Sequence, residues 1–237
     1  MTGSAPHQSH RARLIDSREI APQTRHFTFE MADEDQFSFV PGQFVSLLAE
    51  INDRLITRAY SIASVPAGNR FELCLNLVPE GKFSPYLFAM QPGDEVEAKG
   101  PYGGFIFRQR SDIICIATGT GIAPFRGMLR QRLPEDPGHQ YTLIFGARHR
   151  HGLLYLPELQ QFSADYPNFQ LVPTLTKPPE TWTGRIGRVQ PPMLELIGNR
   201  RDVQVYICGL KEMVDDVRNR LKELGFDRKQ IVYEKYD

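Results

Sequence analysis

Cysteine is scarce in this sequence, which excludes two common classes of metal centre. The 237 residues include only Cys74, Cys115 and Cys208. No two of these are close enough in sequence to form a zinc ribbon or to hold an iron–sulfur cluster. We therefore predict that any redox cofactor of this chain is organic and that it has no metal site.

The sequence also lacks an excess of charge and long apolar runs. Lys plus Arg and Asp plus Glu number 28 each, so no net field attracts the chain to nucleic acid or to an anionic membrane. No apolar segment approaches the ~20 residues that span a bilayer. The polar residues 1–13 lack the apolar core of a secretory signal. We expect a cytoplasmic protein that is soluble and binds neither nucleic acid nor membrane.

The hydrophobic pattern changes near residue 108, which predicts two domains. With 41% hydrophobic residues, a chain of this length can bury two modest cores. After a flexible N-terminus at residues 1–10, residues 11–107 have the alternating apolar and polar positions of short strands, separated by Pro, Gly and Asn. This texture favours a small antiparallel β-barrel. One short helix is expected over residues 83–90.

Residues 108–237 have a different texture, typical of an α/β domain. Residues 113–117, 141–145, 169–175 and 203–207 are continuous apolar runs, as in strands that are covered on both faces. Helix-like segments separate them, and the clearest covers residues 211–224. The alternation predicts a doubly wound parallel sheet, with its ligand crevice at the carboxyl ends of the strands.

Two short motifs in the barrel region are candidates for binding a flavin. The first is Arg58-Ala59-Tyr60-Ser61, and the second is Gly81-Lys82-Phe83-Ser84. Arginine matches a phosphate and tyrosine can stack on an aromatic ring, while the amides at a helix start suit a diphosphate. A surface arginine beside a half-buried strand tyrosine, and an ordinary helix cap, remain the alternatives.

Further motifs in the second region suit a nicotinamide dinucleotide. The run Thr118-Gly119-Thr120-Gly121-Ile122-Ala123-Pro124 follows the first apolar strand and precedes a helix that is expected near Pro124. Its glycines allow a tight turn whose amides face a pyrophosphate. A plain strand-to-helix turn is the alternative. Arg148 is basic at the end of the second parallel strand, where NAD-specific folds often place a carboxylate. With Lys177 and Arg185 from the next crossover it can form a cage for a 2′-phosphate, which favours NADPH over NADH; a solvated cationic loop is the alternative.

Two segments near the C-terminus lie where reacting groups collect in such folds. Cys208-Gly209 ends an apolar strand, although a lone cysteine is more often a small packed residue. The terminal Glu234-Lys235-Tyr236 follows a β-like segment that can dock it into the sheet.

Taken in order, these motifs closely resemble the ferredoxin–NADP reductase family, over nearly the whole chain from about residue 11. The resemblance implies FAD on the barrel domain, with Arg58 on its phosphate, Tyr60 against the isoalloxazine and Ser61 near flavin N5. Residues 81–84 would surround the FAD pyrophosphate. Lysine at position 177, where many bacterial members carry arginine, is a departure from the family pattern, and so is the terminal Asp237 in place of an aromatic residue.

The resemblance also implies roles on the nicotinamide side. The loop from Gly119 to Pro124 would hold the NADP pyrophosphate, and Arg148 with Arg185 would hold the 2′-phosphate. Cys208 would approach the nicotinamide. Glu234 would belong to the proton and hydride-transfer site, and Tyr236 would stack over the flavin until nicotinamide displaces it.

The activity implied is that of an FAD-dependent ferredoxin–NADP reductase. Hydride would pass from nicotinamide C4 to flavin N5 and then, as single electrons, to a separate ferredoxin or flavodoxin. The alternatives are the reductase component of an oxygenase, a free-flavin reductase, and a non-catalytic flavin-binding subunit. A monomer is favoured.

Overall fold

A computed structural model describes residues 9–236 and divides the chain into two compact units. The first runs up to Ile106 and includes Ala123–Met128; the second contains Phe107–Ile122 and the chain from Leu129 onwards. The predicted flexible N-terminus falls largely on residues 1–8, which lie outside the described residues. His10 already belongs to the first strand.

The first unit is a six-stranded antiparallel sheet that closes on itself. Its strands are β1 (His10–Ala21), β2 (Thr24–Met31), β3 (Phe44–Glu50), β4 (Leu55–Ser61), β5 (Arg70–Asn76) and β6 (Glu95–Tyr102), in the order β4-β3-β6-β1-β2-β5. A bridge between Ile62 and Leu73 joins the two edge strands and closes the barrel. The predicted barrel is thus confirmed, as is its short helix, α1 (Phe83–Ala89).

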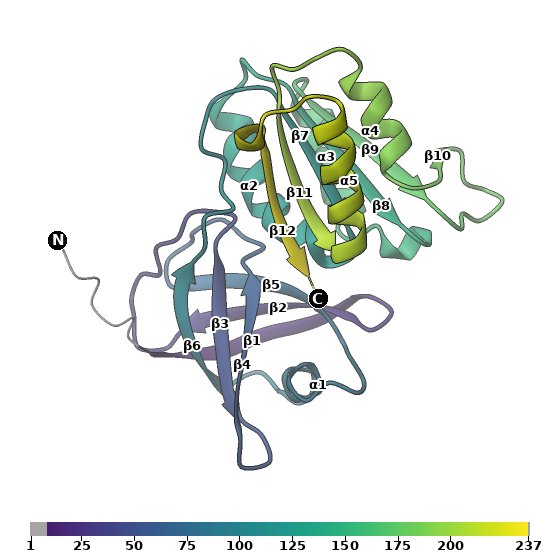
Figure 1. Ribbon diagram of the computed structural model, residues 1–237. Helices are drawn as coiled ribbons and strands as arrows, with labels where there is room; N and C mark the ends of the chain where they lie inside the picture. Colours follow the sequence, from purple (N-terminus) through teal and green to yellow (C-terminus); the bar gives the residue numbers. More distant parts are fainter. Residues whose placement is uncertain (1–8, 237) are drawn as a thin grey trace. The chain divides into compact units, whose positions relative to one another are not determined.

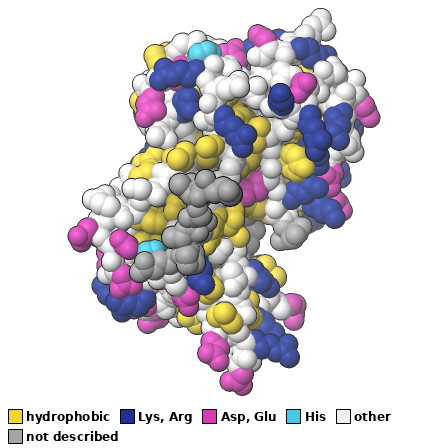
Figure 2. Space-filling view, turned by 60° about the vertical axis from the view of Figure 1, so that its left-hand side comes forward, with side chains coloured by type: hydrophobic (Ala, Val, Ile, Leu, Met, Phe, Trp, Pro, Cys, Tyr) yellow, Lys and Arg dark blue, Asp and Glu magenta, His cyan; other side chains and the backbone are white. Residues whose placement is uncertain are grey.

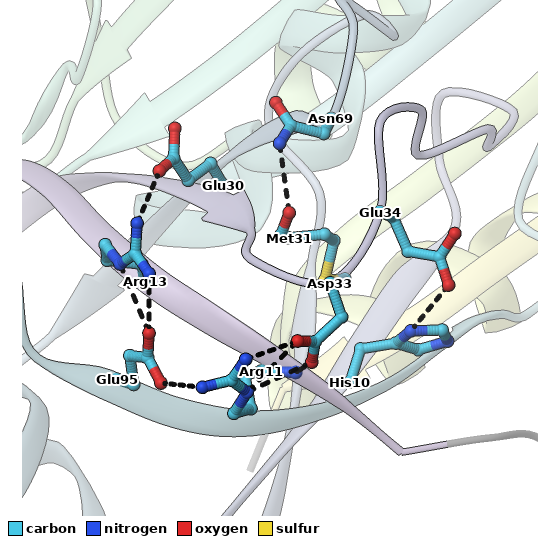
Figure 3. Close-up of polar contacts among 9 residues, drawn as sticks. All are labelled: His10, Arg11, Arg13, Glu30, Met31, Asp33, Glu34, Asn69 and Glu95. Carbon is cyan, nitrogen blue, oxygen red and sulfur yellow. Dashed lines mark hydrogen bonds and ion pairs between the residues drawn. The ribbon is translucent and has the colours of Figure 1, made fainter.

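The barrel is filled by phenylalanines and tied on its surface by ion pairs. Six Phe side chains occupy the core, namely Phe27, Phe29, Phe37, Phe39, Phe71 and Phe83. On the surface, Arg11 of the central strand β1 pairs with Asp33 and with Glu95 of β6 (Figure 3). Arg13, two residues on, pairs with Glu95 and with Glu30 of β2. These pairs link three neighbouring strands and therefore favour their register.

The second unit is a six-stranded parallel sheet, as the apolar runs predict. Its strands are β7 (Ile113–Thr118), β8 (Tyr141–Ala147), β9 (Phe169–Leu175), β10 (Arg185–Ile186), β11 (Gln204–Leu210) and β12 (Ile231–Tyr236), in the order β10-β9-β8-β7-β11-β12. The order reverses between β7 and β11, and in doubly wound sheets ligands bind outside the carboxyl ends of the strands at such a point.

Helices cover both faces of this sheet (Figure 1). The helices α4 (Gln190–Ile197) and α5 (Lys211–Glu223) share one apolar cluster with it. On the other face, Phe162 of α3 (Leu156–Asp165) packs edge-on against Phe169 of β9, with ring centroids 6.2 Å apart. Gly225, with φ +84, caps α5 in a left-handed conformation.

Helix α2 (Ile122–Glu135) begins two residues before the expected Pro124. A 3-10 turn, Gly119–Gly121, leads directly into it. Proline is accepted in the first helical turn because its missing N–H would have no helical acceptor there. Proline therefore marks the first turn of the helix rather than its first residue.

One face of the molecule carries side chains of both charges. On the face in Figure 2, Lys and Arg side chains lie among Asp and Glu side chains. Within residues 9–236, no helix is long and apolar enough to cross a membrane.

Candidate flavin and nicotinamide sites

Alternation along β4 places Arg58 and Tyr60 on one face of that strand. The Arg58 side chain is exposed, and its guanidinium donates a hydrogen bond to the neighbouring Thr57 carbonyl at 2.8 Å. Tyr60 is half-buried and packs against Phe83, with ring centroids 6.2 Å apart. Burial raises the pKa of Tyr60 to about 12, although Arg58 acts in the opposite direction. This face therefore joins an available cation to a neutral phenol ring, which are the groups a flavin phosphate and ring system require.

The other flavin candidates lie at the end of β4 and at the start of α1. Ala59 and Ser61 face the opposite side of β4 from Tyr60, and Ser61 is buried. Gly81 and Lys82 precede α1, in which Phe83 and Ser84 are the first residues. The Ser84 hydroxyl accepts a hydrogen bond from the Val78 amide at 2.9 Å, so in this structure it shapes the turn before the helix.

A cleft of about 780 Å³ opens at the carboxyl edge of the parallel sheet. It is lined by residues at the ends of β7, β8, β9, β10 and β11 or just beyond them, among them Thr118, Gly119, Arg148, Thr176, Arg188 and Leu210. Its size falls within the range of about 300–1,000 Å³ that is usual for small-molecule and cofactor sites. Thr120, Gly121 and Pro124, predicted with this loop, continue into the 3-10 turn and the first turn of α2.

The ends of β7 and β11 meet so closely that two glycines are required. A Cβ atom added to Gly121 would lie 2.3 Å from the Cys208 carbonyl oxygen, and one added to Gly209 would lie 2.3 Å from Thr118 Oγ1. The predicted motifs that contain Gly121 and Gly209 are therefore brought together at the point where the strand order reverses.

The structure also brings Cys208, Glu234 and Tyr236 together. Strand β12 pairs with β11 as far as Leu210 opposite Tyr236, and Glu234 lies level with Cys208. Burial raises the pKa of Cys208 far above its usual value; Glu234 raises it further, while a hydrogen bond with the Tyr236 side chain lowers it. Cys208 is therefore a neutral thiol beside the docked terminal strand β12, and Tyr236 lines the cleft.

We expect the native thiols to be inert toward a thiol reagent at pH 8. All three cysteines are buried, and the thiolate is the reactive form. DTNB should label the native protein at least ~100-fold more slowly than the protein in denaturant, because burial blocks access of the reagent to the thiols and disfavours their ionisation. In denaturant, three thiols should react in the parent and two in Cys208→Ala. Rapid labelling of one native thiol that is lost in Cys208→Ala would contradict a neutral, buried Cys208.

The three predicted phosphate-binding cations are not equivalent in the structure. Arg148 is exposed and lines the cleft, whereas Lys177 and Arg185 are outside its lining. The Arg185 guanidinium makes a two-pronged ion pair with Glu195, with N···O distances of 2.6 and 2.7 Å. Arg188, Gln190, Lys211 and Glu212 do line the cleft, although the sequence motifs did not single them out.

The barrel followed by a doubly wound sheet, with motifs for two nucleotides, defines a class: oxidoreductases that bind FAD and a nicotinamide dinucleotide on separate domains. Two family models match accordingly. Residues 11–107 match the oxidoreductase FAD-binding domain, and residues 115–219 match the oxidoreductase NAD-binding domain.

Known relatives place the chain in a family within this class. It is 38% identical to ferredoxin–NADP reductase B of Sorangium cellulosum over 236 residues, which is 95% of this chain and 97% of that protein. The chain belongs to the ferredoxin–NADP reductase family. It is also 29% identical to the toluate 1,2-dioxygenase electron transfer component of Pseudomonas putida, over 96% of this chain and 67% of that protein. The solved structure of Amycolatopsis cytochrome P450 reductase GcoB is similar at a TM-score of 0.87 and 26% identity, covering 98% of this chain and 72% of that one.

Proposed function

We propose that this reductase passes electrons from NADPH through FAD to a separate one-electron carrier, a ferredoxin or a flavodoxin, in the cytoplasm. The observation that carries the proposal is the meeting of Cys208, Glu234 and Tyr236 beside a cleft of cofactor size. Bound FAD would accept hydride from the nicotinamide and release electrons one at a time, which is chemistry of the cofactor. The three cysteines within these 237 residues do not provide an iron–sulfur cluster, which supports a carrier on a separate molecule.

On the flavin side, the roles proposed for the chain are binding and orientation. Arg58 holds an FAD phosphate through its planar fork, and Tyr60 supports the ring system. Ser61 lies near flavin N5. Backbone amides of Gly81, Lys82 and Phe83 approach the pyrophosphate, with Ser84 fixing their turn through Val78.

On the nicotinamide side, the amides of Gly119–Gly121 bind the pyrophosphate, since the turn leads into the start of α2. Cys208 contacts the nicotinamide as a neutral thiol, and Glu234 serves the proton and hydride-transfer site. Tyr236 covers the flavin until the nicotinamide displaces it. These roles remain predictions.

The choice of acceptor is the direct test. We expect the purified protein to contain FAD and, with NADPH, to reduce a ferredoxin or flavodoxin from the same genome. That reduction should be at least ~10-fold more efficient, in kcat/KM, than reduction of free FMN or riboflavin, because a docked carrier is held in place for transfer. Free flavin as the fastest acceptor would contradict the proposal in favour of a free-flavin reductase.

A second candidate is the reductase component of an oxygenase. The similarity to the dioxygenase electron transfer component favours it, although this chain corresponds to 67% of that protein. It predicts fastest electron transfer to an oxygenase or to its dedicated ferredoxin. A chain that binds FAD but reduces no dye with NADPH would instead be a non-catalytic binding subunit.

A further inference from the structure

A second, smaller pocket of about 300 Å³ lies in the second unit, near the amino ends of the strands β11 and β12. The residues that line this amino-edge pocket are Arg108, Gln109, Gln204, Tyr206, Lys229 and Val232. The larger cleft opens at the carboxyl edge of the same sheet, and none of its described lining residues belongs to the pocket. The seven residues of β11 span roughly 20 Å between the two edges. The pocket is therefore a separate site.

Alternation along the strands gives the amino-edge pocket its floor. Gln204 and Tyr206 are two residues apart on β11 and point to the same face of the sheet, and Val232 of β12 lies level with Tyr206. Val205 and Ile207, which alternate with them, belong to the apolar cluster that β11 shares with α4 and α5. The floor therefore lies on the face of the sheet that is turned away from α4 and α5.

The wall that carries Lys229 is held by hydrogen bonds. Lys229 belongs to a 3-10 turn, Arg228–Gln230. The Asp227 carboxylate caps this turn and accepts a hydrogen bond from the Lys229 amide at 2.7 Å. The Gln230 side-chain amide donates to the Val203 carbonyl at 3.2 Å, which ties the turn to the residue before β11. Lys229 is thus displayed from a fixed backbone.

The wall that carries Arg108 is fixed through the residue before it. The Phe107 ring packs edge-on against Tyr206, with ring centroids 5.0 Å apart. The Arg132 guanidinium donates a hydrogen bond to the Phe107 carbonyl at 3.1 Å. The Arg108 amide itself lies 3.4 Å from the Tyr206 hydroxyl, to which it donates. These contacts hold the backbone from which Arg108 and Gln109 leave.

The charge of the amino-edge pocket is positive. Arg108 and Lys229 are exposed cations, and none of the described lining residues is Asp or Glu. Burial raises the pKa of Tyr206, so its phenol is neutral at pH 7. Two cations, two carboxamides and a neutral ring form the lining, together with one apolar side chain. Such a lining suits an anion that also offers groups for hydrogen bonding.

We propose that the amino-edge pocket binds a small phosphate monoester. The planar fork of Arg108 and the point charge of Lys229 complement a phosphate dianion, and the carboxamide of Gln204 adds a hydrogen-bond donor. A volume of about 300 Å³ is at the lower end of the usual range for ligand sites, so the ligand is small. Bound there, it connects the segment through which the chain enters the second unit to β12, which carries Tyr236 at its other end.

The experiment measures binding of glycerol 3-phosphate to the FAD-loaded protein at low ionic strength, where exposed charges are least screened. In ¹⁵N-labelled protein, the backbone amide signals of Arg108 and Lys229 and the side-chain amide signal of Gln204 report on the pocket. The test variants are Arg108→Gln and Lys229→Gln. Arg228→Gln is the matched control, because Arg228 is exposed and adjacent to Lys229 but outside the lining. Arg148→Gln removes a cation from the larger cleft instead.

The parent should bind glycerol 3-phosphate with a Kd of about 1 mM, as two charge-assisted contacts can provide. Glycerol, which lacks the phosphate, should leave the pocket signals unshifted. Arg108→Gln and Lys229→Gln should each weaken binding about 10-fold or more. With Arg228→Gln and with Arg148→Gln, the affinity that the pocket signals report should stay within about threefold of the parent.

Three outcomes overturn the inference. Pocket signals of the parent that do not shift at probe concentrations well above that Kd show that the pocket binds no phosphate monoester. Binding that is lost in Arg148→Gln and kept in Arg108→Gln and Lys229→Gln places the phosphate in the larger cleft. An equal loss in Arg228→Gln and Lys229→Gln shows attraction to surface charge without a site.

Discussion

Replacing Arg126 with methionine should lower the free energy of unfolding by about 3–5 kcal/mol, because it leaves a carboxylate without its cation. Arg126 is only 5% exposed, and its guanidinium donates a hydrogen bond to the Ala63 carbonyl at 2.7 Å and pairs with Glu72. The nearby His26 is no substitute. In the parent, burial lowers the pKa of His26 to about 4; Glu72 opposes this shift and Arg126 adds to it. Burial, the largest cause, remains when Arg126 is replaced.

Two further variants isolate the cause of that loss. Arg130 lies one turn further along α2; its side chain is 46% exposed, and its Nε is 3.9 Å from a carboxylate oxygen of Glu158. Arg130→Met should therefore lower the free energy of unfolding by less than about 1 kcal/mol. Adding Glu72→Gln to Arg126→Met should restore part of the stability, because the stranded charge is removed. The measurement is urea unfolding at pH 7. An Arg126→Met protein as stable as Arg130→Met would contradict the account.

Replacing Gly209 with alanine should lower the free energy of unfolding by about 2–6 kcal/mol, because backbone strain and a steric overlap add together. Gly209 has φ +149, which L-residues rarely adopt, and this strain is worth about 1–3 kcal/mol. The new Cβ would also lie 2.3 Å from Thr118 Oγ1 and 2.9 Å from the Met213 methyl carbon, and such overpacking costs about 1–3 kcal/mol.

A matched glycine separates the two sources. Gly93 has φ +101, and nothing lies within 4 Å of an added Cβ, so Gly93→Ala reports only the backbone strain. The difference between the two variants in unfolding free energy measures the close approach of β7 and β11. Equal losses in both would show that this approach is looser than the structure has it. NADP⁺ affinity should fall in Gly209→Ala only, since Thr118 lines the cleft.

Local periodicity was sufficient to predict most of the second domain. Residues 169–175 coincide with β9, and the helix expected over residues 211–224 ends one residue earlier as α5. These elements follow from apolar runs and from an i, i+3, i+4 stripe, which the sequence displays directly. The glycines after β7 predicted a tight turn before a helix, and the 3-10 turn Gly119–Gly121 lies there. The close approach of Gly121 to Gly209 was not predicted, because it joins residues far apart in the sequence.

Contacts between residues far apart in the sequence could not be predicted from local patterns. The contact of Arg126 with Glu72 joins residues 54 apart, and the short strand β10 has too few residues for a periodic signal. The ion pair that occupies Arg185 depends on Glu195, which belongs to the next helix. Arg188 lines the cleft, and Gly187 precedes it with φ +120. Glycine permits a turn at a strand end, so Gly187 was a local sequence signal that the chain turns there.

We expect NADPH to reduce FAD bound to this chain and the electrons to leave one at a time. The most direct measurement is anaerobic stopped-flow reduction of the FAD-loaded protein, followed by addition of oxidised ferredoxin in excess. NADPH should bleach the visible flavin absorption faster than NADH at equal concentration, and two ferredoxins should be reduced for each NADPH oxidised. Flavin that NADPH leaves oxidised, or reduced flavin that ferredoxin does not reoxidise, would contradict the account.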